Sequence, residues 1–156
     1  MPVPQASVSV VDSSGNPAGG PYRVSKTVTF TGAADLGAVG AVPIFTVTGE
    51  VWVVVMVAIC TVDLTEAAPT ATLSLGVTGS TVKFIAATTA IDIDAGDFWI
   101  DATPDPNAAT IPTSMKDIAI TDNIIGTVAA QAVDSGAIRF DLWWRPLSSD
   151  GNVVAA

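Results

Sequence analysis

The side chains that could do chemistry here are almost all aspartates. Four of them, Asp92, Asp94, Asp97 and Asp101, lie within ten residues of one another. Calcium takes six to eight oxygen ligands, and a D-x-D-x-x-D loop can supply three carboxylates. The stretch lacks the rest of an EF-hand and its distal glutamate, so we interpret it as an acidic turn. Asp92, Asp94 and Asp97 remain the candidate metal ligands, and the sequence predicts neither a bound metal nor another cofactor.

Nucleophilic catalysis has little support in this sequence. The chain has no histidine, which removes the commonest general base, and it contains no G-x-S-x-G, S-x-x-K or Walker motif. The single cysteine, Cys60, lies inside the most apolar run and is interpreted as a small buried side chain. We therefore expect a protein that is not an enzyme.

A pair of carboxylates could still hydrolyse a glycosidic bond, because the chain has 13 aspartates. Such a groove also needs aromatic side chains on which a sugar ring can stack. Of the four tryptophans, we expect Trp52 and Trp144 to be core residues. Trp99 and Trp143 remain as possible platforms, and they also keep open a glycan-binding function.

The composition favours protein partners. Charged residues make up 13% of the chain, against about 25% in an average domain. A monomer with so few charges leaves neutral or apolar surface to be covered. The net charge of −9 argues against nucleic acid, whose phosphates require clustered lysine and arginine.

Period-two alternation and frequent glycine and proline turns predict an all-β domain over residues 24–156. We expect a single β-sandwich, jelly-roll-like, or a barrel. Residues 70–77 and 81–87 form the clearest hairpin. The other expected strands are residues 24–30, 42–48, 51–62, 116–120, 124–129 and 137–145, and the acidic stretch of residues 91–101 is expected to lead into a further short strand.

Residues 51–60 form a continuous apolar run with many β-branched side chains. The run is too short for a membrane-spanning helix, which needs about 20 residues. It is typical of a central strand that is buried on both faces. We expect no membrane association, and the first five residues do not resemble a signal peptide.

Two segments are expected to meet partners. In residues 137–145, Trp143 falls on the otherwise polar face of an amphipathic strand, where a large apolar ring invites a partner. Residues 1–23 are predicted to be an extended N-terminal arm, with Val8 and Val10 as its contact residues and many turn formers after them. Such an arm could lie across a neighbouring subunit or remain a loose terminus.

The sequence resembles small structural proteins of tailed bacteriophages. The resemblance lies in residues 27–49, 86–97 and 142–151, and residues 11–17 are similar to the leaders of phage head and fibre proteins. It implies a virion component assembled in the host cytoplasm, either a capsid decoration (cement) protein or a head-fibre subunit. Its partners would be copies of itself in a homotrimer, the major capsid protein or other virion proteins. The alternative is a tail-associated module that binds a receptor or glycan.

Overall fold

The computed structural model describes residues 21–156, which are almost entirely β-structure. Eleven strands are joined by loops and by two short 3-10 helices, η1 (Ala90–Asp92) and η2 (Thr113–Met115). The strands are β1 (Tyr22–Thr29), β2 (Gly40–Thr48), β3 (Val51–Thr65), β4 (Thr72–Val77), β5 (Ser80–Thr89), β6 (Asp97–Phe98), β7 (Asp105–Pro106), β8 (Lys116–Ile120), β9 (Ile124–Ala129), β10 (Ser135–Pro146) and β11 (Asn152–Ala155).

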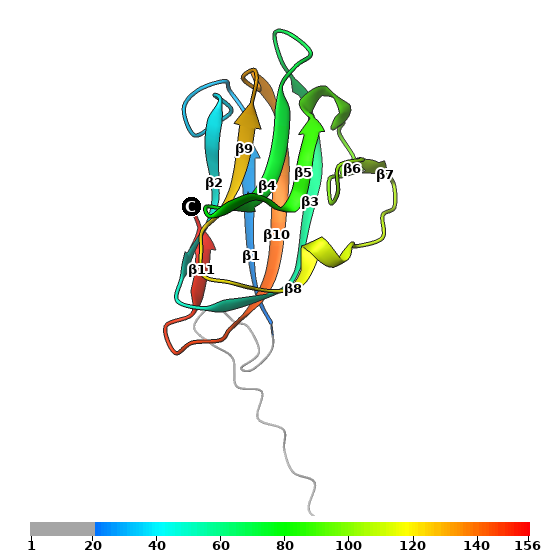
Figure 1. The fold of residues 1–156 in the computed structure, drawn as a ribbon. Helices are drawn as coiled ribbons and strands as arrows, with labels where there is room; N and C mark the ends of the chain where they lie inside the picture. Colours follow the sequence, from blue (N-terminus) through cyan, green and yellow to red (C-terminus); the bar gives the residue numbers. More distant parts are fainter. Residues whose placement is uncertain (1–20) are drawn as a thin grey trace, which may run out of the picture.

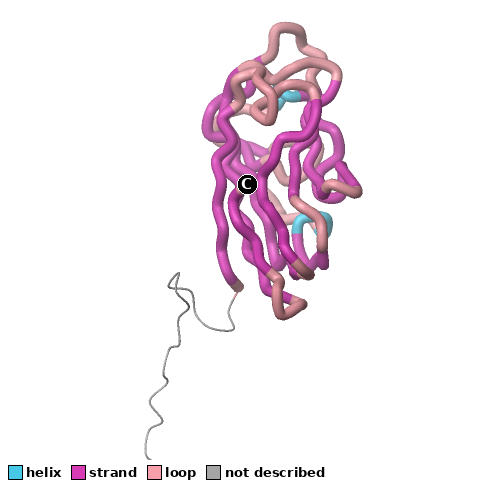
Figure 2. Tube along the Cα trace, turned by 90° about the vertical axis from the view of Figure 1, so that its left-hand side faces the viewer, coloured by secondary structure: helices cyan, strands magenta, loops and turns pink. Residues whose placement is uncertain are grey.

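The strands form two antiparallel sheets packed face to face, as Figures 1 and 2 show. Sheet 1 has the order β1-β10-β3-β6-β7, and β8 also pairs with β3. Sheet 2 has the order β11-β2-β9-β4-β5. The predicted sandwich is therefore confirmed, and the alternative of a closed barrel is wrong because the two sheets are separate.

The strand order is that of a jelly roll. When β1, β2, β3, β4, β5, β8, β9 and β10 are counted as strands one to eight, sheet 1 contains one-eight-three-six and sheet 2 contains two-seven-four-five. This order arises when two Greek keys are wrapped together, so that the chain passes repeatedly between the sheets. Strand β11 then extends sheet 2 beyond β2.

The core lies between the sheets and follows the pleat. In β10, Ile138, Phe140, Leu142 and Trp144 are buried and alternate along the strand, as the sequence predicts. Phe45 and Leu73 meet them from sheet 2 and are also fully buried. The crossing from β2 to β3 turns at Gly49, whose φ of +64° favours glycine.

Several predicted boundaries agree closely with the structure. The expected hairpin is β4–β5, and β8 and β9 have the predicted bounds. Strand β1 begins at Tyr22, so the last two residues of the predicted arm belong to sheet 1. The rest of the arm, with Val8 and Val10, lies outside the described residues.

Two elements differ from the prediction. Strand β11 is not among the strands expected from the sequence, yet it pairs with β2 and buries Val153. Residues 91–101, expected to lead into a short strand, contribute only Asp97 and Phe98 to β6. Within residues 21–156, no helix has the length and apolar character needed to cross a membrane.

Candidate functional site

The outer face of sheet 1 carries an apolar row along β3. The inward side chains of this strand, such as Met56 and Ala58, are fully buried, whereas Trp52, Val54 and Val57 are only partly covered. The prediction that the run is buried on both faces is therefore wrong for the isolated chain. One face packs on the core, and the described residues cover the other face only partly.

This apolar row continues onto β10. Trp143 pairs with Val55, next to a shift in the register between the two strands. A shallow groove of about 440 Å³ lies on this surface. All of its lining residues are apolar: Pro21, Val54, Val55, Val57, Ile111 and Trp143. We call this surface the Trp143 groove. It is suited to an apolar segment and not to a charged ligand.

A buried carboxylate anchors the face beside the groove. Asp141 accepts hydrogen bonds from Arg23 Nη2 at 2.5 Å and from Arg139 Nε at 2.9 Å. Its side chain is 5% exposed, whereas those of Arg23 and Arg139 are 52% and 44% exposed. Burial alone would raise the pKa of Asp141, but hydrogen bonds from Arg23, Ser25 and Arg139 outweigh it and lower that pKa.

Two arginines lie over the outward tryptophans. The Arg23 guanidinium carbon is 5.4 Å from the centre of the Trp143 ring, and that of Arg145 is 5.9 Å from Trp52. Both distances suit cation–π attraction. Tryptophan and arginine are the residues most enriched at binding hot spots between proteins. The arrangement therefore has the chemistry of a contact surface.

The burial of two of the four tryptophans, Trp52 and Trp99, differs from the prediction. Trp144 is buried as expected, but Trp52 lies half-buried on the outer face of sheet 1. Trp99 is fully buried, donates from Nε1 to Thr88 Oγ1 at 3.0 Å and packs edge-on against Phe140. Trp99 therefore cannot serve as an exposed sugar platform, and of the two predicted platforms only Trp143 keeps that role.

Two carboxylates of the acidic stretch, those of Asp97 and Asp101, accept hydrogen bonds from backbone amides. Asp97 Oδ2 accepts from the Asp94 amide at 3.2 Å, and Asp101 Oδ1 accepts from the Thr103 amide at 2.7 Å. Asp92 is exposed in η1. Over residues 21–156, no three acidic or thiol side chains gather in a way that could hold a metal ion. The structure therefore does not bring Asp92, Asp94 and Asp97 together as ligands.

Cys60 is buried in the core on β3, as predicted. Its thiol lies near the carbonyl oxygens of Val62, at 3.1 Å, and Ile93, at 3.5 Å. Burial raises its pKa to about 11. The thiolate, which is the reactive form, is therefore scarce at neutral pH.

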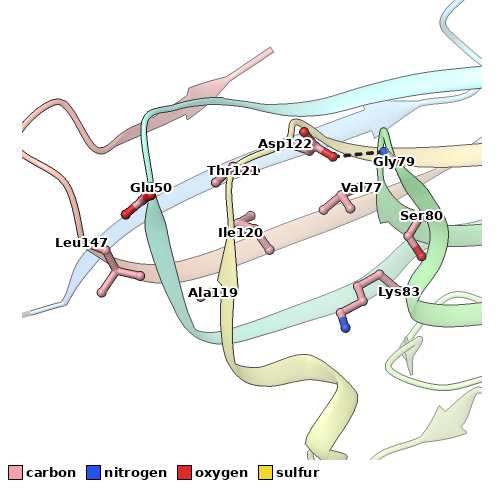
Figure 3. Close-up of a pocket in the computed structure, with 10 residues that line it drawn as sticks. All are labelled: Glu50, Val77, Gly79, Ser80, Lys83, Ala119, Ile120, Thr121, Asp122 and Leu147. Carbon is pink, nitrogen blue, oxygen red and sulfur yellow. Dashed lines mark hydrogen bonds between the residues drawn. The ribbon is translucent and has the colours of Figure 1, made fainter.

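A second depression, of about 580 Å³, lies where β8, the β4–β5 turn and Leu147 meet (Figure 3). Glu50, Lys83 and Asp122 bring both signs of charge to it. Asp122 is engaged with the turn, because its Oδ2 accepts from the Gly79 amide at 3.2 Å. None of the described residues that line the depression is aromatic, so they offer no ring on which a sugar could stack.

The sequence identified Trp143 but missed the residues around it. Arg23 and Asp141 lie 118 positions apart, and only the pairing of β1 with β10 brings them together. Pro21 and Ile111, which both line the groove, lie 90 positions apart. A usable signal did exist for the β3 row, because its continuous apolar run exceeds what a strand with one buried face requires.

Comparisons with known proteins do not assign a function to this chain. No family model matches the sequence, and no curated protein matches it. Among solved structures, a chain from the cyanophage Pam1 capsid asymmetric unit is similar, with 20% identity over 92% of this chain and 96% of that one, at a TM-score of 0.42. Values this low do not assign a role to this chain.

Proposed function

We propose that this protein is a structural subunit of a bacteriophage particle that works through protein–protein contacts and not through catalysis. Its type would be a capsid decoration (cement) or head-fibre protein, assembled in the host cytoplasm and retained in the virion. The phage setting comes from the resemblance of the sequence. The contact mechanism comes from the surface of the domain.

One observation carries the contact mechanism: on the outer face of sheet 1, the row formed by β3 and Trp143 is apolar where a solvated face is expected to be polar. Val54, Val57 and Trp143 point away from the core and line a groove without a polar side chain. The flanking arginines add the composition of an interface hot spot. Covering this face with another protein removes apolar surface from water, at roughly 25 cal/mol per Å² before ordering costs.

The partners we propose are further copies of this chain and other virion proteins, including the major capsid protein. A closed symmetric oligomer, a homotrimer in our proposal, would place the Trp143 groove at each subunit boundary. The low charge content agrees with this arrangement, since 13% charged residues leave much of the surface neutral.

The mass of the protein in solution tests the contact mechanism. We expect the wild type to form an oligomer in light scattering, and Trp143→Ala to raise its dissociation constant about 30-fold, as expected for a hot-spot residue. Thr46→Ala, at an exposed position of β2 in sheet 2, is the matched control and should change nothing. A wild type that stays monomeric at all concentrations would contradict the proposal.

The location in the particle is a separate test. Electron microscopy of phage particles carrying a tagged copy should show the label at regular positions on the capsid. Label confined to the tail would support the receptor- or glycan-binding alternative instead. Particles without any label would show that the protein is not a virion component.

A further inference from the structure

We infer that the Trp143 groove of one copy receives residues 6–11 of a neighbouring copy. Val8 and Val10 of that segment would pack against Val57 and Trp143. This inference rests on the proposed function, and it names the contact through which the copies associate.

The groove selects for an apolar segment. It is lined by three valines of β3 and by Pro21, Ile111 and Trp143. None of these side chains can form an ion pair or donate a strong hydrogen bond, except through the indole nitrogen. A charged side chain lying against the valines would lose hydration without gaining a partner from the lining residues.

The N-terminal segment has the complementary composition. Residues 6–11 read Ala-Ser-Val-Ser-Val-Val, and no charged side chain occurs before Asp12. In an extended conformation Val8 and Val10 share one side, while Ser7 and Ser9 share the other. Such a segment spans about 20 Å, and it can present valine to the groove and serine to solvent.

The position of Pro21 brings the segment within reach of a groove. This residue forms part of the groove and is also the point where the described chain begins. Residues 12–20, which join Pro21 to the segment, span at most about 30 Å. The proposed function brings copies of the chain together at this surface, so we assign the segment in the groove to a neighbouring copy. Disulfide trapping distinguishes a neighbour's segment from the chain's own.

Disulfide trapping between separately labelled full-length chains tests the inference. One chain carries Val10→Cys and the other Val57→Cys, each with Cys60→Ala to remove the native thiol. The two are mixed and oxidised, and the mixed disulfide is quantified by mass spectrometry. In the control, Val82→Cys replaces Val57→Cys, because Val82 is exposed on β5 of sheet 2. We expect at least tenfold more mixed disulfide with Val57→Cys than with Val82→Cys.

Two further measurements distinguish failure of this inference from failure of the proposed function. An intramolecular disulfide in a chain carrying both Val10→Cys and Val57→Cys, with none between chains, would overturn the inference because the segment would then lie in its own groove. Light scattering of the unoxidised mixture is recorded in parallel. An intact oligomer that gives equal yields at Val57→Cys and Val82→Cys would overturn this inference alone, whereas a monomer would overturn the proposed function as well.

Discussion

The outer faces of the two sheets differ although both sheets cover the same core. On sheet 2, β2 points Thr46 and Thr48 into solvent, and both are exposed as on an ordinary solvated sheet. On sheet 1, the corresponding outward positions of β3 are Trp52, Val54 and Val57. An antiparallel sheet with one face on the core normally alternates apolar and polar residues, and β2 follows this rule at these positions whereas β3 does not.

Under the proposed function, this difference marks the face where the domain meets a partner. A strand needs apolar side chains on one face to pack a sandwich core, and β3 meets that need with Val51, Val53 and Met56. The apolar side chains on its other face, Trp52, Val54 and Val57, are only partly buried. They would lower solubility unless another surface covered them. The apolar side chains on the outer face of β3, which the core does not require, therefore mark the proposed contact surface.

The largest expected effect is a difference in stability between substitutions on the two sides of a single strand, β10. Phe140→Ala should lower the free energy of unfolding by about 4 kcal/mol, because Phe140 is fully buried and its removal leaves a cavity. Trp143→Ala, on the opposite side of β10, should lower it by less than about 1 kcal/mol, in keeping with its partial exposure. Urea unfolding at a concentration where the protein is monomeric measures both. Equal losses would mean that Trp143 belongs to the core.

The next effect concerns the buried carboxylate of sheet 1. Asp141→Asn should lower the free energy of unfolding by about 2 kcal/mol at pH 7, since it weakens two charge-assisted hydrogen bonds from arginines. The pKa of Asp141 is lowered in the fold. Its stabilising contribution is therefore complete above the unfolded pKa, about 3.9, and is lost as the pH falls through the folded pKa. Urea titrations at pH 7 and at progressively lower pH measure this loss.

Asp92→Asn is the control for that prediction, because Asp92 is exposed. It should change the free energy of unfolding by no more than about 0.5 kcal/mol, both at pH 7 and at the lower pH values. If the difference between wild type and Asp141→Asn stays constant down to low pH, the ion pairs are not its source.

A smaller effect tests the outer faces directly. Val57→Thr keeps the shape of the side chain and its preference for strands but adds a hydroxyl to the groove. We expect association to weaken by about 1 kcal/mol, roughly fivefold in the dissociation constant, because the hydroxyl is desolvated in the contact. Val154→Thr on β11, where Val154 is 48% exposed, should leave association unchanged. Analytical ultracentrifugation measures both, and equal effects would remove the distinction between the two sheets.

The smallest effect concerns Arg145, which lies over Trp52. Arg145→Ala should weaken association by about 0.5 kcal/mol, since exposed cation–π pairs contribute little. The same ultracentrifugation series measures it. Arg145→Lys keeps the charge and should recover part of the loss, whereas a loss unchanged by lysine would point to the guanidinium plane as the important feature.

The strands were predictable where a local pattern specified them. The alternation in residues 137–145 predicted which side of β10 is buried, and Thr78-Gly79-Ser80 predicted the turn of the β4–β5 hairpin. Strand β11 was not predictable because it is only four residues long and gains its stability from pairing with β2. Burial of Trp99 was equally hidden, since its neighbour Phe140 lies far away in the sequence.

By itself the sequence determined the class of the fold, the inward face of most strands and the presence of Trp143 on an outward face. These properties follow from residue types at a spacing of two, which each segment carries within itself. Only the tertiary structure decided the jelly-roll order, the Arg23–Asp141–Arg139 network and the groove beside Trp143. Each of these depends on pairing between strands far apart in the chain, because a short strand can satisfy its backbone hydrogen bonds equally well with many different neighbours.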